Sequence, residues 1–322
     1  MKQVVFKHGS AQLTDVPAPT VSPNSVLIKV VSSCISAGTE LSCMLGSKDG
    51  LIKRAMKQPE NIIKAANYAR EEGFLKTVDM LKAKNNTVEQ AGYSIAGIVI
   101  GVGNNVNDYN VGDRVAAAGG SAVHAEYVEV PEKLVVKIPG NVDFCLASTV
   151  AIGSIALHGV RRSETSLGEF VAVYGVGLIG QIIIGLLSLC GARVIAIDIN
   201  KKNLSLSIKM GAENVFDAND KNMIRNVNAL TSGRGVDKVI FSANTNNAEA
   251  LSNAFKIIRK KGCLIMLGVW GNELNRADIY DKEIDFKIST SYGPGRYDKN
   301  YEELGIDYPY HYVRWTENRN ME

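Results

Sequence analysis

The sequence predicts an α/β protein made of two domains and a short return segment. Three observations support that prediction. Short β-like runs separated by glycine, proline and asparagine turns fill residues 1–142, which is typical of a compact β-rich domain. Strand-like and helical stretches alternate over residues 143–288, as in a doubly wound parallel sheet. Within that second domain, residues 170–198 read strand, glycine-rich turn, helix, strand and acidic residue in order.

The first domain contains four clear β-like runs: Val26–Ser32, Ala96–Val102, Arg114–Ala118 and Tyr127–Val130. A different kind of segment interrupts them at residues 51–84, where apolar residues recur at helical spacing and only Gly73 and Pro59 break the pattern. We expect a helical insertion there. Its many lysines are typical of a solvated face.

The second domain contains six strand candidates: Phe170–Tyr174, Val194–Ile197, Asn214–Phe216, Lys238–Ser242, Cys263–Leu267 and Asp285–Ser289. The last two are candidates to pair across the edge of a homodimer. The return segment, residues 289–322, is rich in tyrosine and is expected to pack on the first domain. Its aromatic residues and arginines fit either plain packing or a site for a polar, sugar-like ligand.

The glycine-rich turn has the spacing of a dinucleotide-binding site and consists of Gly175, Val176, Gly177, Leu178, Ile179 and Gly180. The first glycine permits a tight turn from strand to helix. The second lets a pyrophosphate approach the backbone, and the third lets the helix pack closely on the strand. The start of the helix offers unpaired N–H groups and a partial positive charge to the phosphates.

Asp198 ends the second strand, 18 residues after Gly180, where a carboxylate can accept hydrogen bonds from both ribose hydroxyls of the adenosine. Because it would repel a 2′-phosphate, we expect NAD(H) to be preferred over NADP(H). The nearby Lys201 and Lys202 weaken that preference without reversing it. Four further cofactor contacts are expected from strand ends and from the start of the preceding helix: Thr149, Asn244, Gly268 and Val269.

Composition excludes several classes of protein. The net charge of +3 over 322 residues and the lack of a basic stripe give no sign of a nucleic-acid partner. The longest apolar run, Leu178–Ala192, is too short and too interrupted to insert in a membrane. Five scattered cysteines without a CxxC pair indicate a reduced, cytoplasmic chain.

Several phrases together resemble the medium-chain dehydrogenase/reductase family, which is alcohol dehydrogenase-like. They are Gly101-Val-Gly103, Val111-Gly-Asp-Arg-Val115, His124-Ala-Glu-Tyr-Val128, Ala156-Leu-His-Gly-Val160 and the glycine turn. The resemblance implies a GroES-like first domain, a Rossmann second domain, a nicotinamide cofactor and a small-molecule substrate.

The zinc-binding phrases of that family are altered in this sequence. Ala37 stands where the family has a catalytic cysteine, and Tyr93 and Ser94 replace a histidine and a glutamate. The four-cysteine lobe that would follow Gly112-Asp-Arg114 is also missing from the sequence. A methyl, a phenol and a hydroxyl are poor zinc ligands, so we expect no zinc.

Finer phrases, Ile35–Glu40, Gly92–Gly97 and the return segment, are similar to a zinc-free branch of the family. Members of that branch often form the N-terminal half of two-domain oxidoreductases associated with surface-polysaccharide synthesis. Their second half resembles the glucose–fructose oxidoreductase/inositol dehydrogenase family. The resemblance therefore implies a C-terminal oxidoreductase domain as a partner that this chain lacks.

Without zinc, side chains must position the reacting oxygen and move its proton. Thr39 matches the family position whose hydroxyl hands on the substrate proton, and Tyr93 stands where a metal ligand would. Glu40 is expected to orient its neighbours. The candidate substrate contacts are Ser94, Tyr292 and Arg296.

The function expected from these residues is zinc-independent hydride transfer between NAD(H) and a carbinol or carbonyl carbon. The family association favours a sugar, sugar nucleotide or polyol as the substrate. Two alternatives stay open. One is an NADPH-dependent quinone or enone reductase, and the other is a nucleotide-binding module whose catalysis depends on a missing partner domain.

Overall fold

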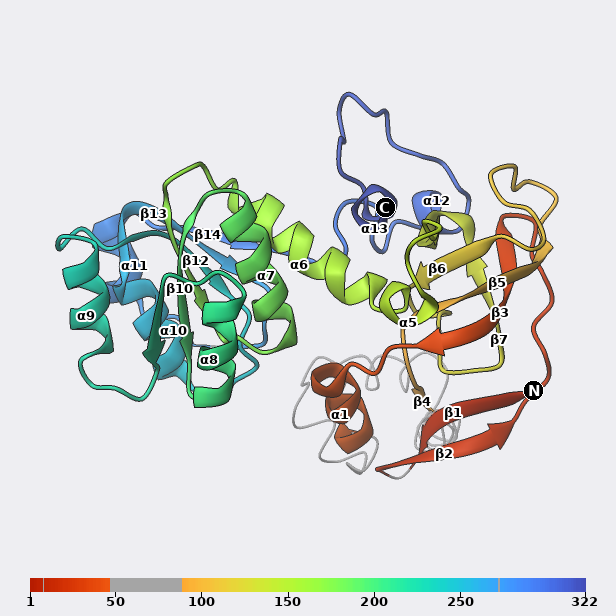
Figure 1. Cartoon of the computed structure of the whole chain (residues 1–322), viewed down its shortest axis with the longest axis horizontal. Coiled ribbons are helices and arrows are strands. Elements are labelled where there is room, and N and C mark those ends of the chain that lie inside the picture. The colour runs from red at the N-terminus through yellow and green to blue at the C-terminus, as the bar shows by residue number, and fades with distance from the viewer. Residues whose placement is uncertain (8, 47–88, 272) are drawn as a thin grey trace, which may run out of the picture. The chain divides into compact units, whose positions relative to one another are not determined.

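The computed structural model describes residues 1–7, 9–46, 89–271 and 273–322, which form two compact units (Figure 1). One unit is Met1–Val150 and the other is Ala151–Glu322. We expected the boundary between the domains after residue 142. The two units divide after Val150 instead, where helix α6 (Val150–Ser163) begins. The helical insertion expected at residues 51–84 lies outside the described residues.

The first unit contains a five-stranded antiparallel sheet of order β7-β3-β5-β6-β8. Its strands are β3 (Ser25–Ser33), β5 (Ser94–Val102), β6 (Arg114–Ala118), β7 (Tyr127–Pro131) and β8 (Val135–Lys137). In β3, Val26 and Ile28 are fully buried while Lys29 is exposed, as a half-buried strand requires. The structure thus confirms the β-rich domain.

A smaller antiparallel sheet of order β2-β1-β4 was not expected from the sequence. Its strands are β1 (Lys2–Lys7), β2 (Ser10–Asp15) and β4 (Glu89–Gln90). Every residue of β2 is exposed, so no apolar alternation marks it as a strand. Three short helices complete the described part of this unit: α1 (Ala37–Gly46), η1 (Glu132–Leu134) and α5 (Phe144–Ala147).

The second unit contains the six-stranded parallel sheet that the sequence predicts, in the order β11-β10-β9-β12-β13-β14. Its strands are β9 (Phe170–Tyr174), β10 (Arg193–Asp198), β11 (Asn214–Asp217), β12 (Val236–Phe241), β13 (Ile258–Met266) and β14 (Asp285–Ile288). The chain leaves β9 toward one side for β10 and later returns on the other side for β12. The carboxyl ends of β9 and β12 therefore form the topological switch point, where open α/β sheets bind ligands.

Helices cover both faces of this sheet (Figure 1). Val171 and Val173 of β9 pack with residues of α6, α7 and α8, while Ala172 and Tyr174 pack with residues of α9 and α10. The helices are α7 (Leu178–Leu189), α8 (Lys201–Lys209), α9 (Met223–Leu230), α10 (Ala248–Lys256), α11 (Arg276–Ile279) and η2 (Tyr280–Lys282). Strand β9 is thus buried on both faces.

The two late strands considered for a dimer edge pair with each other in the same sheet, with Cys263 opposite Asp285. Strand β14 is consequently the outer strand. The return segment, with α12 (Lys299–Glu302) and α13 (Glu317–Met321), belongs to the Ala151–Glu322 unit. Asn320 attaches it to α6, since its carbonyl accepts a hydrogen bond from Ser154 and its side-chain oxygen accepts one from Arg161. Packing of this segment on the first domain stays a prediction.

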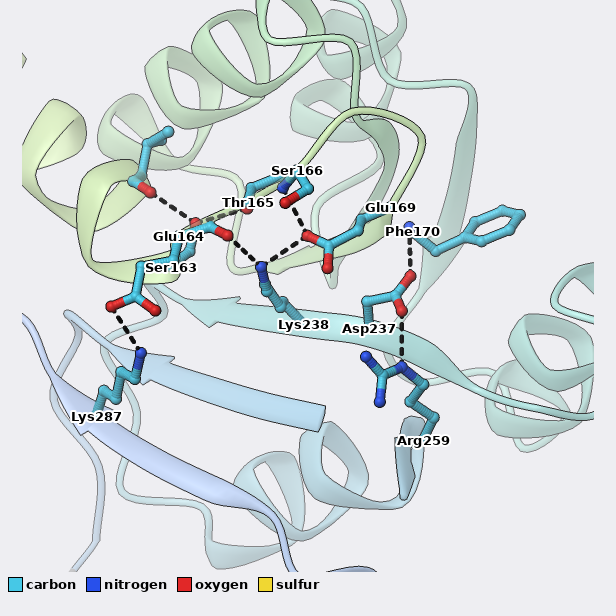
Figure 2. Close-up of polar contacts among 11 residues, drawn as sticks. Ser163, Glu164, Thr165, Ser166, Glu169, Phe170, Asp237, Lys238, Arg259 and Lys287 are labelled. Atoms are coloured by element: carbon cyan, nitrogen blue, oxygen red, sulfur yellow. Dashed lines mark hydrogen bonds and ion pairs between the residues drawn. The ribbon is translucent and has the colours of Figure 1, made fainter. Parts of the chain in front are cut away.

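A polar network holds the loop between α6 and β9 (Figure 2). The Lys238 Nζ on β12 donates to the Glu164 carbonyl and to Glu169 Oε2, each at 2.6 Å. Lys287 on β14 pairs with the Glu164 carboxylate at 3.0 Å. The Phe170 N–H donates to Asp237 at 2.8 Å. These contacts fix the start of β9, and hence the position of the glycine turn at its end.

Candidate active site

The glycine turn follows β9 and opens α7 as predicted. Gly175 has φ +89°, and a Cβ added there would lie 2.4 Å from the Ala243 nitrogen. A Cβ on Gly180 would lie 2.3 Å from the Gly175 carbonyl oxygen. A Cβ on Gly177, in contrast, would meet nothing within 4 Å. The first and third glycines are thus required by packing, while the second borders open space at the helix start, as a pyrophosphate site requires.

Two polar side chains that the sequence analysis did not assign hold this turn. Gln181, only 6% exposed, donates through Nε2 to the carbonyls of Val176 at 2.8 Å and Asn203 at 2.9 Å. Ser242, at the end of β12, donates to the Gly175 carbonyl at 2.6 Å. A glutamine inside an otherwise apolar helical run was the only signal that the sequence offered for this role.

Asp198 lies beside the turn, at the carboxyl end of β10. Its Oδ2 accepts the Val176 N–H at 2.7 Å, and its Oδ1 accepts the Asn200 N–H at 2.7 Å. Each carboxylate oxygen can accept a further hydrogen bond. The half-buried carboxylate is thus oriented by backbone donors and keeps capacity for two ribose hydroxyls.

The strand ends bring three of the remaining candidates together. Asn244 and Val269 form a parallel bridge beyond β12 and β13. A Cβ on Gly268 would lie 1.9 Å from the Ala243 carbonyl oxygen, so only glycine allows this approach. Thr149 lies in the first unit, just before α6, where its hydroxyl donates to the Leu146 carbonyl at 2.7 Å. Its contact with a nicotinamide ring stays a prediction.

In the first unit, Glu40 connects two of the phrases that carry the candidate catalytic residues. It lies in α1 and is 7% exposed, and its Oε1 accepts the Ser36 N–H at 2.7 Å. Its Oε2 lies 3.0 Å from His124 Nε2. A Cβ on Gly92 would lie 2.7 Å from His124 Nδ1, so the imidazole packs against the residue that precedes Tyr93. Glu40 therefore contacts both Ser36 and His124, and its orienting role in catalysis stays a prediction.

The other candidates of this unit differ in how accessible they are. Thr39 is exposed, with its hydroxyl 3.5 Å from that of Ser36, and Tyr93 is half-buried. Ser94 is 1% exposed, and its hydroxyl donates to the Ser148 carbonyl at 2.6 Å. Thr39 and Tyr93 are therefore better placed to meet a substrate than Ser94, whose substrate contact stays a prediction.

The two candidates in the return segment already have protein partners. Tyr292 is 4% exposed, and its carbonyl accepts a hydrogen bond from Asn320 at 2.6 Å. Arg296 pairs with Glu302 and lies over the rings of Tyr297 and Tyr292, at 4.1 and 5.4 Å from their centroids. Their role in substrate binding also stays a prediction.

Metal ligands are poorly represented around the catalytic phrases. Across residues 1–7, 9–46, 89–271 and 273–322, no three His, Cys, Asp or Glu side chains are grouped so that they could hold a metal ion. Burial raises the pKa of the Cys34 and Cys43 thiols, which disfavours the thiolate form that binds zinc.

Within the described helices, none is long and apolar enough to cross a membrane.

A glycine turn at the switch point of a doubly wound sheet, with an acidic residue beside it, defines a dinucleotide-binding protein. Two family models agree with that class. Residues 75–140 match the alcohol dehydrogenase GroES-like domain, and residues 179–305 match the zinc-binding dehydrogenase model.

Individual relatives extend the match over most of the chain. L-threonine 3-dehydrogenase of Bacillus subtilis (strain 168) is 30% identical over 269 residues, covering 74% of this chain and 68% of that protein. Sorbitol dehydrogenase of the same organism is 24% identical, covering 95% and 84%. The crystal structure of galactitol-1-phosphate dehydrogenase from Escherichia coli superposes with a TM-score of 0.72 at 19% identity, covering 92% and 85%.

This chain belongs to the medium-chain dehydrogenase/reductase family. The family consists of nicotinamide-dependent oxidoreductases, and the expected GroES-like and Rossmann domains are confirmed.

Proposed function

We propose that this protein is a zinc-independent, NAD(H)-dependent oxidoreductase that acts on a carbinol or carbonyl carbon of a sugar, sugar nucleotide or polyol. The main observation in support is the arrangement at the switch point. Open space over Gly177 borders the start of α7, and the oriented Asp198 carboxylate lies beside it. Both features fit a dinucleotide, the first its pyrophosphate and the second its adenosine ribose.

When it is bound, NAD(H) supplies the hydride acceptor or donor. The chain has to supply orientation and proton transfer. For reduction of a carbonyl, the exposed Thr39 hydroxyl can donate its proton to the substrate oxygen, and the Ser36 hydroxyl, which donates to Thr39 Oγ1 at 3.5 Å, can replace that proton. For oxidation of an alcohol, the same two hydroxyls can pass the proton in the opposite direction. The Glu40 carboxylate accepts a hydrogen bond from the Ser36 N–H, so it keeps the start of α1 in place during that proton transfer. The Tyr93 phenol is the second candidate to position the oxygen.

The proposal of zinc independence depends on the donors at the family's metal positions. Ala37, Tyr93 and Ser94 offer no thiolate, imidazole or carboxylate there, and the Ser94 hydroxyl is engaged with a backbone carbonyl. No step in the proposed reaction is assigned to a metal. Activity that survives exhaustive dialysis against a chelator, with no zinc found by elemental analysis, is the expected result.

The substrate class is inferred from relatives and from the resemblance to enzymes of surface-polysaccharide synthesis. The similar proteins include a sorbitol and a galactitol-1-phosphate dehydrogenase, both named for polyols. The same resemblance favours a C-terminal oxidoreductase partner domain. A homodimer and a cytoplasmic location are further expectations of this proposal.

Calorimetry with NADH and NADPH on the folded chain tests the cofactor assignment. We expect NADH to bind and NADPH to bind more weakly. A panel of sugars, sugar nucleotides and polyols, each assayed for NADH formation at 340 nm, then tests the reaction. Folded protein that binds neither nucleotide would refute the proposal.

One observation favours the NADPH-dependent alternative. Lys201 and Lys202 are exposed at the start of α8, within a few residues of Asp198, where they could attract a 2′-phosphate. A clear preference for NADPH in paired titrations, together with reduction of quinones or enones, would establish that alternative. Binding of NADH without turnover of any panel member would favour the module that needs a partner domain.

A further inference from the structure

Three arginines and two aromatic rings gather where the return segment meets α6. The Arg161 guanidinium carbon lies 3.3 Å from the centroid of the Trp315 ring, and that of Arg314 lies 3.7 Å from the same centroid. Arg314 also lies 4.6 Å from the centroid of Tyr310, as Arg319 does at 5.1 Å. We call these five residues the arginine–tryptophan cluster.

The cluster leaves guanidinium N–H groups available. Stacking uses the flat face of a guanidinium, so its five N–H donors stay free in the plane around its edge. Arg319 donates hydrogen bonds to the Asp307 carboxylate and the Val313 carbonyl, and Arg161 donates one to the Asn320 side chain. Arg314 is exposed and makes neither a hydrogen bond nor an ion pair with any part of the chain that the structure describes.

Asp307 balances the charge of Arg319, but no ion pair among the described residues balances the charges of Arg161 and Arg314. Because Arg161 and Arg314 both lie over one ring, their charged carbons are no more than about 7 Å apart. Burial and the charge of Arg314 lower the pKa of Arg161. Glu317, on the same segment, gives no compensation, because burial and then Glu302 raise its pKa to about 9 and keep it neutral at pH 7. An anion placed at the edges of these guanidinium groups would relieve this repulsion.

The contacts that join the return segment to α6 do not require Arg314. Arg161 already stacks on Trp315 and donates to Asn320, which is enough to join α6 to the segment. Arg314 places a second guanidinium close to that of Arg161 and forms no hydrogen bond that would offset their repulsion. A ligand that carries negative charge would offset it, which gives Arg314 a role in binding rather than in folding.

We propose that the arginine–tryptophan cluster binds an oxyanion of a sugar ligand, a phosphate or a carboxylate, with Arg314 as its main donor. The choice of a sugar as the ligand rests on the proposed function, whereas binding of the oxyanion itself does not. The ligand class is therefore a sugar that carries such a group: a sugar phosphate, a sugar nucleotide or a sugar acid. Trp315 is 38% exposed, so it can report on binding at its edge.

Fluorescence titration tests this proposal in the full chain. The protein has two tryptophans, so Trp270→Phe leaves Trp315 as the only reporter. The probes are glucose 1-phosphate, glucuronate and uncharged glucose. We expect at least one charged probe to change the fluorescence saturably, and glucose not to do so. Arg314→Gln should weaken that binding at least tenfold. The matched control Arg225→Gln, which removes another exposed arginine, from α9, should leave it unchanged.

Four results would overturn the proposal: no saturable response to either charged probe, equal binding of glucose, unchanged binding in the Arg314→Gln variant, or equal weakening by both arginine variants. Binding of a phosphate at the glycine turn instead of at the cluster would give the third of these results. The relative affinity for glucose 1-phosphate and glucuronate decides between phosphate and carboxylate. NADH calorimetry on the Arg314→Gln variant separates the two proposals, because cofactor binding there should be intact whether or not the cluster binds an anion.

Discussion

Replacing Glu317 by glutamine is expected to stabilise this protein at neutral pH. Glu317 begins α13 and is fully buried, and neither carboxyl oxygen has a hydrogen-bond donor among the described residues. Burial and then the nearby Glu302 carboxylate raise its pKa from 4.5 to about 9. Glu302 is itself paired with Arg296, whose charge lowers the pKa of Glu317 without cancelling the rise.

The size of the expected gain in stability follows from the rise in the pKa of Glu317. Below pH 4.5 the carboxyl is protonated in both the folded and the unfolded chain, so its ionisation costs no stability. Between pH 4.5 and about 9 the unfolded chain loses the proton while the folded chain keeps it, and the free energy of unfolding falls by about 1.4 kcal/mol per pH unit. At pH 7 this loss is about 3 kcal/mol. Glutamine has no proton to lose, so Glu317→Gln should recover that amount.

Hydrogen exchange measured by mass spectrometry on peptides that contain α13 gives the opening free energy at pH 6, 7 and 8, after correction for intrinsic exchange. The advantage of Glu317→Gln should grow with each pH step, while the exposed Glu273→Gln should behave as the native protein at every pH. An advantage that is constant with pH, or absent at pH 8, would refute the assignment of a neutral buried carboxyl.

Three further outcomes are expected. Gly177→Ala should change the free energy of unfolding by about 1 kcal/mol or less but weaken NADH binding at least tenfold. Gly180→Ala should lower the free energy of unfolding, because its Cβ meets a carbonyl oxygen at 2.3 Å. Urea denaturation measures the stability of both variants, and calorimetry measures their NADH binding. Asp198→Ala should weaken NADH binding roughly tenfold to a hundredfold in calorimetry, and an unchanged affinity would contradict the ribose assignment. Lys238→Met should cost about 2 kcal/mol in urea denaturation, partly recovered when Glu169→Gln is added; strict additivity of the two changes would contradict the ion pair.

The second domain could be predicted from sequence because its signals are local. Each strand of the parallel sheet is an apolar run, and Gly175 and Asp198 are separated by one strand–helix–strand unit. Burial on both faces of β9 makes such runs continuous, so they stand out against the polar turns. The turn and the acidic residue are therefore placed by the same short stretch of chain that identifies them.

The contacts that could not be predicted join residues far apart in sequence. Glu40 and His124 are separated by 84 positions, and nothing in either phrase indicates that an imidazole meets that carboxylate. Strand β2 was missed because it has no buried residue. The partners of Arg314 within the return segment depend on irregular backbone, where no periodicity helps.

The double burial of β9 has a consequence for the thermodynamics of cofactor binding. The glycine turn extends from a strand that is packed from above and below, and its carbonyls are already held by Gln181 and Ser242. Little conformational entropy remains to be lost when a nucleotide arrives, so most of the contact free energy can appear as affinity. Calorimetry should then show a heat-capacity change no larger than direct burial of the nucleotide would give, without a contribution from a segment that folds on binding.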